Sequence, residues 1–238
     1  MAKATYEQQQ AIGKLSSDCS PLLTHLVRQN DGRSDADARR TLHSILGLWP
    51  ETTPKLLARH TGWYGSESVT PRVFSPEKAR LLETNEYDKS QLQCVCFTES
   101  TLEGLKAHNQ IFKAKYGLAF SRDFLLGKGA NPCLNLREEL LKKSIKSAYD
   151  QYDRHVYNFI PMVLHPYVNV INHGFDATHE REWRHVGDLT FSREDIRYVF
   201  CPRAEQEEFS SRLGTISGLQ FHDLESPEDV VEHTPCLS

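Results

Sequence analysis

Two carboxylates and a guanidinium stand at alternate positions in the segment 179–184. Glu180, Glu182 and Arg184 are separated by single residues, so an extended chain presents all three side chains on one face. Neighbouring carboxylates oppose each other's ionisation and favour a cation beside them. The segment is therefore either a salt-bridge ladder or a place where carboxylate chemistry is done.

Two shorter polar groups precede this segment in the chain. His60, Thr61 and Gly62 end one apolar run, and Thr98 and Ser100 end another. Each group is a weak signal alone, because Ser and Thr at a strand end usually cap the backbone and a histidine after an apolar run is usually structural. Their order along the chain is more informative than any one of them.

The composition is that of a globular protein without a dedicated surface for polyanions. A hydrophobic fraction of 39 % and a charged fraction of 25 % over 238 residues are typical of folded domains with a sizeable core. The formal net charge of −4 does not favour nucleic acid as a partner, although the basic stretch 137–146 leaves a local contact open.

The sequence predicts a cytoplasmic protein with no membrane contact. It has no apolar run long enough to cross a bilayer and no apolar signal-peptide core near Met1. Its six cysteines are scattered, without a C-x-x-C pair. We expect reduced thiols, not a zinc site or a disulfide framework.

Apolar spacing predicts an α+β fold, with amino-terminal helices packed on a mixed, largely antiparallel sheet. Helices are expected over 6–15, 21–28, 36–48 after the cap Ser34, 75–82, 102–115 and 137–152. Strands are expected over 94–100, 116–120, 133–136, 180–185 and 196–201, with a strand or helix over 159–171 and a turn at 127–132. The expected organisation is a helical segment (1–50), a core (51–202) and a C-terminal helix with an acidic tail (203–238), all in one compact domain.

Four motifs together resemble a known family. They are C-F-T-E at 96–99, K-Y-G-L-A-F at 115–120, K-G-A-N-P at 128–132 and E-x-E-W-R at 180–184. In this order they resemble the AbiGi family of phage abortive-infection proteins, whose assigned role is that of an antitoxin. The resemblance spans about residues 55–202 and implies a phage-defence function with a toxin or phage protein as partner.

A looser resemblance concerns chemistry. ADP-ribosyltransferases carry an Arg or His on a first strand, a Ser/Thr-rich strand and a Glu-x-Glu strand, in that chain order. The resemblance implies that His60, with Thr61 and Gly62 beside it, binds the adenosine-side ribose of NAD. It also implies that Thr98 or Ser100 braces the nicotinamide pocket.

The same resemblance assigns the catalytic carboxylates. Glu182 would hold the 2′-hydroxyl of the nicotinamide ribose, where a carboxylate stabilises the oxocarbenium character that develops as the glycosidic bond breaks. Glu180 would orient the incoming nucleophile or accept its proton. An aromatic ring, Tyr64, Tyr116 or Trp183, would stack on the nicotinamide.

Three alternatives remain open. Glu99 departs from the transferase pattern, and Arg184 can neutralise the neighbouring carboxylates, which would leave a transferase-like fold without activity. In that case the chain is a binding module, with a partner surface on 22–27 or 42–48. A metal-dependent nuclease is less favoured, because no H-E-x-x-H helix is present. Its candidate ligands would be His173, Asp176, His179, Glu180 and Glu182.

Overall fold

The structure is a computed structural model that describes residues 20–27, 34–49, 51–59, 93–137, 139–140, 162–171 and 178–226. These residues divide between two compact units. The first unit is drawn from residues 1–55, 98–125 and 190–238, and the second from residues 56–97 and 126–189.

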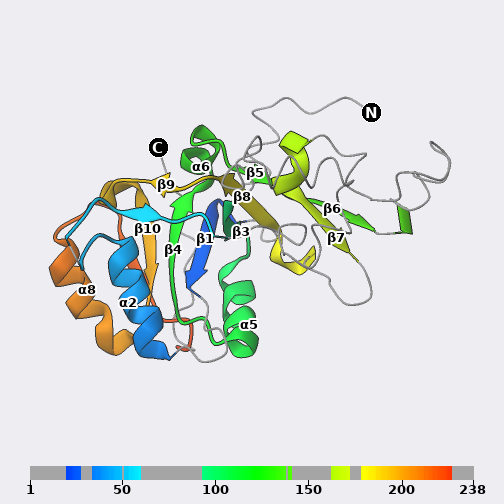
Figure 1. Ribbon diagram of the computed structural model, residues 1–238. Helices are drawn as coiled ribbons and strands as arrows, with labels where there is room; N and C mark the ends of the chain where they lie inside the picture. Colours follow the sequence, from blue (N-terminus) through cyan, green and yellow to red (C-terminus); the bar gives the residue numbers. More distant parts are fainter. Residues whose placement is uncertain are drawn as a thin grey trace, which may run out of the picture. The chain divides into compact units, whose positions relative to one another are not determined.

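A seven-stranded sheet runs in the order β11-β10-β4-β1-β3-β8-β5 (Figure 1). Its strands are β1 (Leu22–Val27), β3 (Cys94–Thr98), β4 (Tyr116–Ser121), β5 (Asn131–Pro132), β8 (Glu182–Val186), β10 (Ile196–Phe200) and β11 (Gln220–His222). β10 and β11 pair in parallel, whereas β1 with β3, β1 with β4, β10 with β4 and β5 with β8 pair antiparallel. The predicted α+β class with a mixed, mostly antiparallel sheet is confirmed.

One predicted helix of the first unit is a strand. Residues 21–28 were expected to be helical, but β1 pairs with β4 from Leu22 opposite Ser121 to Val27 opposite Tyr116. A short apolar run does not by itself distinguish a buried strand from a buried helix. Strand pairing therefore decided the conformation here.

Gly117 of β4 allows the close approach of these two strands. A Cβ atom at this position would lie 2.7 Å from the carbonyl oxygen of His25, which is closer than carbon and oxygen tolerate. The packing of β1 against β4 therefore requires a glycine at position 117, in the K-Y-G-L-A-F motif.

Helix α2 (Asp35–Ile45) begins where the sequence predicts. Ser34 accepts a hydrogen bond from the Asp37 amide, and the Asp37 carboxylate accepts one from the Ser34 amide, which is a complete capping box. Leu42, Ile45 and Leu46 are buried, so the helix packs its apolar stripe on the unit's core. Leu23 and Val27 of β1 are buried as well, so most of the apolar side chains of the expected partner surface on 22–27 or 42–48 lie in the core.

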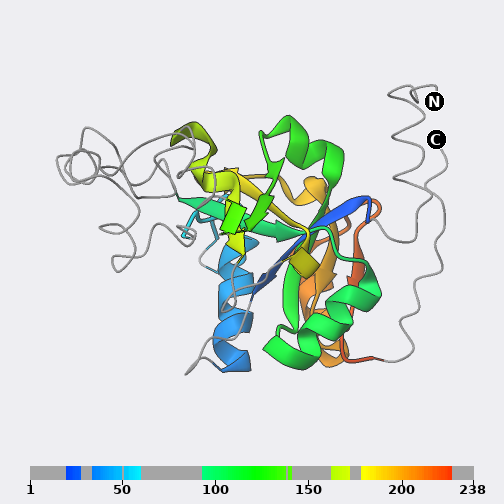
Figure 2. The same cartoon turned by 90° about the vertical axis from the view of Figure 1, so that its right-hand side faces the viewer.

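The first unit's described residues also form the helices α5 (Leu102–Phe112) and α8 (Gln206–Leu213) and the short 3-10 turns η6 (Arg193–Asp195) and η7 (Arg203–Glu205). Helix α6 (Arg122–Gly127) begins in the first unit and ends with two residues assigned to the second. Figure 2 shows α2 and α5 on opposite sides of β1 and β4. Leu105 of α5 packs with Ala119 and Phe200 in one core cluster. α6 was not predicted, because its single turn and a half carries too little periodicity to read.

The second unit contains a two-stranded parallel sheet besides its share of the large one. Its pair is β6 (Leu134–Arg137) with β7 (Val168–Ile171), and β7 follows the 3-10 turn η4 (Met162–Tyr167). A further 3-10 turn, η5 (Thr178–Glu180), leads into β8. The short strands β2 (Lys55–Leu56) and β9 (Leu189–Thr190) form another two-stranded sheet.

Several predictions lie outside the described residues, namely the helices over 6–15 and 75–82 and most of that over 137–152. The 102–115 helix and the 94–100, 116–120, 133–136 and 196–201 strands are confirmed within a few residues as α5, β3, β4, β6 and β10. Within the described ranges, none of the helices is long and apolar enough to cross a membrane.

Candidate functional site

The residues expected to form an NAD site fall into three groups. His60, Thr61 and Gly62 lie outside the described residues. Thr98, Ser100 and Tyr116 lie in the first unit. Glu180 and Glu182 lie in the second unit.

Glu182 lies at the centre of a closed network of hydrogen bonds in the second unit. The Arg184 guanidinium donates from Nε to Glu182 Oε1 at 2.8 Å and from Nη2 to Glu182 Oε2 at 2.9 Å. Asn169 Nδ2 donates to Oε2 at 2.9 Å. Both carboxylate oxygens are therefore engaged by protein donors.

Arg184 is equally well satisfied. Its remaining bonds run from Nη1 to the Pro166 carbonyl oxygen at 2.7 Å and from Nη2 to Asn169 Oδ1 at 2.6 Å. Glu182, Arg184 and Asn169 are 8 %, 2 % and 2 % exposed. The network thus joins β8 to β7 and to the end of η4, and solvent barely reaches it.

The electrostatics follow from this arrangement. Burial raises the pKa of Glu182, but the hydrogen bonds and charge of Arg184, helped by Asn169, outweigh it and hold that pKa below its ordinary value. Arg184 keeps its charge because the facing carboxylate more than offsets the desolvation. The pair is an ionised, desolvated salt bridge.

Glu180 does not share a strand with Glu182. The expected strand over 180–185 begins only at Glu182, because Glu180 belongs to η5 and Arg181 has a positive φ of 44°. A left-handed residue breaks the alternation that was predicted to put the two carboxylates on one face. The Glu-x-Glu spacing therefore does not place the two carboxylates on one face of a strand here, although Arg184 does neutralise Glu182 as the ladder alternative predicted.

The predicted site residues Thr98 and Ser100 are in contact with each other. Their hydroxyl oxygens are 2.6 Å apart, and Thr98 Oγ1 also accepts from the Ser100 amide at 3.2 Å. Beside them in sequence, Glu99 is buried and paired with Arg122 at 3.2 Å. The carboxylate that departs from the transferase pattern is thus neutralised, by an arginine whose role the sequence did not signal.

Tyr116 is a core residue. It is 2 % exposed, and its hydroxyl donates to Glu205 Oε1 at 2.9 Å. Burial first, and then the Glu205 carboxylate, raise the pKa of Tyr116. Arg39 of α2 joins the same cluster through Glu205 at 3.3 Å and through Glu208. The ring holds β4 to η7 in the first unit.

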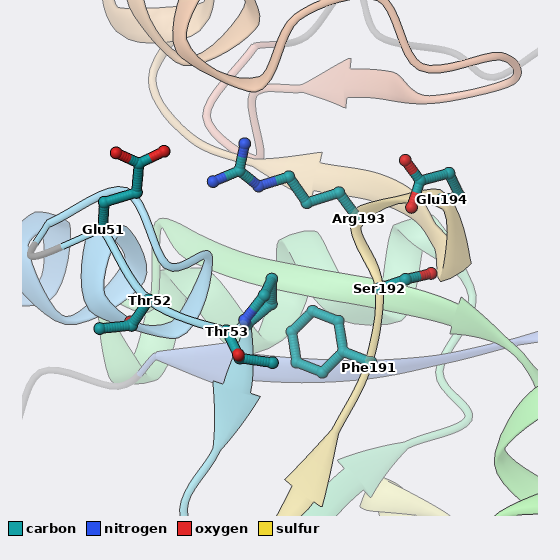
Figure 3. Close-up of a pocket in the computed structure, with 8 residues that line it drawn as sticks. Glu51, Thr52, Thr53, Phe191, Ser192, Arg193 and Glu194 are labelled. Carbon is teal, nitrogen blue, oxygen red and sulfur yellow. The ribbon is translucent and has the colours of Figure 1, made fainter.

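A groove of about 560 Å³ lies in the first unit and contains none of the predicted site residues. Residues 51–54 and 191–194 line it. Figure 3 shows the Arg193 guanidinium extending toward Glu51, while Glu194 points the other way. Arg193 is anchored by a 3.3 Å hydrogen bond from Nη2 to the Gly47 carbonyl oxygen.

The hairpin beside this groove carries an exposed tryptophan. Leu48 and Glu51 form a β-bridge, and Gly47 has a φ of 62° with no room for a Cβ atom, which would lie 2.0 Å from the Thr52 carbonyl oxygen. On this constrained turn Trp49 is 73 % exposed. Sequence reasoning missed it, because an exposed Trp in a predicted helix end gives no distinct pattern.

Metal chemistry finds no support in the described part of the chain, where no group of three His, Cys, Asp or Glu side chains is placed to hold an ion. His173 and Asp176 lie outside that part.

No protein-family model matches this chain, and neither does any curated protein or solved structure. The resemblances drawn from the motifs therefore stand as hypotheses.

Proposed function

We propose that this chain is a phage-defence protein of the abortive-infection type that acts by binding a protein partner, with Glu182 in a structural role. The ordered motifs at 96–99, 115–120, 128–132 and 180–184 support the assignment to abortive infection. The partner-binding mode corresponds to the antitoxin role that the AbiGi resemblance implies.

One observation carries the choice of binding over catalysis. A carboxylate that stabilises a ribose oxocarbenium ion must offer an oxygen to the substrate. Both oxygens of Glu182 are occupied by Arg184 and Asn169 within 2.9 Å, in a place that is 8 % exposed. Substrate would have to replace bonds that already satisfy a buried charge, at a large cost in free energy.

The exposed Trp49 supports a protein partner. Tryptophan is enriched among the residues that dominate binding energy at protein interfaces. Here it stands on a turn fixed by the Leu48–Glu51 bridge and by the hydrogen bond from Arg193 to Gly47. A partner that covers Trp49 would bury a large apolar area with little loss of backbone entropy.

NAD binding or ADP-ribosyl transfer is the second candidate. Its support is the chain order His60, Thr98, Glu182 together with the contact between the Thr98 and Ser100 hydroxyls. In this case NAD is the cofactor or substrate, and the acceptor of ADP-ribose is a macromolecule.

Partner binding and NAD chemistry can be distinguished in a host that carries the gene for this chain together with its native genomic neighbours. The growth of that host and its survival of phage infection are measured. We expect Trp49→Asp to alter growth or phage survival while the protein stays folded. We expect Thr98→Ala with Ser100→Ala to leave both unchanged. The opposite pattern would refute partner binding through Trp49 and favour the NAD site.

Ile111 supplies the matched control. It is also 73 % exposed, at the end of α5, so Ile111→Asp adds the same charge to an equally open position. An effect of Ile111→Asp as large as that of Trp49→Asp would mean that the phenotype reports added surface charge and not a specific contact.

A further inference from the structure

The groove beside Trp49 in the first unit has a fixed shape. Its two walls are joined by a hydrogen bond of 3.3 Å from the Phe191 amide to the Pro54 carbonyl oxygen. The Phe191 ring is 4 % exposed and packs edge-on against Phe120 of β4, with ring centroids 4.9 Å apart. The groove therefore exists before any ligand binds, which reduces the conformational entropy that a ligand must offset.

The walls of this groove are open to solvent. Five of its eight lining residues are exposed, namely Glu51, Thr52, Thr53, Ser192 and Glu194. A site for a small molecule encloses most of the ligand's surface, and walls as exposed as these do not. They suit a longer ligand that runs through the groove and continues beyond it, as an extended protein segment does.

The charged side chains of the groove are negative in sum. The two carboxylates of Glu51 and Glu194 and the single guanidinium of Arg193 line it, which leaves one negative charge. Figure 3 shows the two glutamates toward opposite ends of the lining, with Arg193 between them. The two arginines beside them donate to backbone carbonyl oxygens, Arg193 to that of Gly47 and Arg197 to that of Glu194. Cationic side chains of a ligand would therefore complement the two carboxylates.

We propose that this groove binds an extended, basic segment of the partner protein, with lysine or arginine side chains opposite Glu51 and Glu194 and an apolar side chain against Trp49. The inference rests on the proposed function and adds to it the chemistry of the partner. The exposed carboxylates speed the encounter with a basic segment and reject an acidic one. The contact with the tryptophan supplies most of the binding energy.

Photo-cross-linking in the host that carries the native genomic neighbours identifies the segment. The cross-linker p-benzoylphenylalanine replaces Thr53, which is exposed on one wall of the groove, and the captured peptide is sequenced by mass spectrometry. We expect a segment with a net positive charge and at least two lysine or arginine residues. Capture of an acidic segment, of nucleic acid or of a second copy of this chain, or no capture at all, would overturn the proposal.

Charge reversal tests whether the two glutamates recognise the segment. The captured segment is made as a synthetic peptide, and its affinity for the purified full-length chain is measured by calorimetry at low salt. We expect Glu51→Lys with Glu194→Lys to weaken binding by about ten-fold or more. An undiminished affinity of this variant overturns the proposal.

A matched control separates recognition in the groove from the net charge of the protein. Glu103→Lys with Glu207→Lys makes the same change of net charge at exposed positions of α5 and α8. We expect this control to weaken binding by less than about three-fold, because charges outside the groove are screened by salt. Equal losses in the control and in the groove variant overturn the proposal.

Trp49→Asp in the same titration separates this inference from the proposed function. Binding that is lost both in Trp49→Asp and in the groove variant is the expected result, with circular dichroism confirming that both are folded. Loss in Trp49→Asp alone overturns the basic segment and leaves partner binding through Trp49 in place. Undiminished binding by Trp49→Asp refutes the proposed function itself.

Discussion

Each unit contains an arginine paired with a carboxylate, Arg184 with Glu182 and Arg39 with Glu208, but the two pairs differ in their access to water. In the second unit, Arg184 and Glu182 are almost wholly buried, and all three guanidinium nitrogens donate to protein oxygens. In the first unit, Arg39 and Glu208 have side chains 36 % and 39 % exposed, and Arg39 also contacts Glu205. Water can replace Glu208 as a partner of Arg39, but it cannot replace Glu182 as the partner of Arg184.

We therefore expect the buried Glu182–Arg184 pair to matter more for the free energy of unfolding than the exposed Arg39–Glu208 pair. Breaking a buried pair leaves an uncompensated charge, whereas breaking an exposed one costs little. The comparison also bears on function, because a closed ion pair has no oxygen left for a substrate. The following variants test it from the largest expected effect to the smallest.

Glu182→Ala should lower the free energy of unfolding by about 4 kcal/mol, because it leaves the Arg184 charge buried without its partner. Urea unfolding followed by circular dichroism measures the change. Glu180→Ala is the control from the preceding 3-10 turn, and we expect it to cost less than about 1 kcal/mol. Equal losses in the two variants would contradict the distinction between them.

Replacing both partners should cost less than removing one. The double variant Glu182→Met with Arg184→Met removes both charges, so no desolvated ion is left unpaired. We expect it to be more stable than Glu182→Ala by about 1–3 kcal/mol in the same urea experiment. A double variant less stable than the single one would show that the pair contributes through its hydrogen bonds to Asn169 and Pro166 and not through mutual charge compensation.

The sequence predicts only part of the Glu182–Arg184 network. The spacing of Glu182 and Arg184 left two alternatives, a salt bridge or a catalytic carboxylate, and the structure shows the salt bridge. The spacing could not indicate Asn169 or the Pro166 carbonyl, because these come from a distant segment and carry no pattern of their own. The positive φ of Arg181 was equally invisible, since arginine has no preference for that conformation.

The helices and strands also differ in whether nearby or distant residues determine them. The helix cap at Ser34 and the strand 116–120 are encoded by neighbouring residues and were predicted correctly. The segment 21–28 was not, because its apolar residues suit a helix as well as a strand buried between β3 and β4. Local signals thus predicted the elements they encode, and long-range pairing determined the others.

The contribution of Glu182 should depend on pH. Its pKa is lowered in the folded protein from an ordinary value of 4.5, so the stability it provides is present above that value and is lost as the pH falls through the folded pKa. The difference in unfolding free energy between the wild type and Glu182→Gln should therefore be largest near neutral pH and shrink below about pH 4. A difference that stays constant down to pH 3 would show that folding does not lower the pKa of Glu182, and a difference that shifts in favour of the wild type as the pH falls would show a carboxyl that is neutral in the folded state.

The exposed cluster should give the smallest effect. Glu208→Gln, which weakens the contacts with Arg39, should cost no more than about 1 kcal/mol, and 1 M salt should abolish the difference from the wild type. Urea unfolding at low and high salt measures both. A loss that matches that of Glu182→Ala would remove the contrast between the two units.

The most direct test of the central claim, that Glu182 supports the fold and not catalysis, is a calorimetric titration of the purified full-length protein with NAD, followed by chromatography for nicotinamide in the same sample. The account predicts no release of nicotinamide by the wild type. Release that disappears in a folded Glu182→Gln variant would contradict it and make Glu182 a catalytic residue.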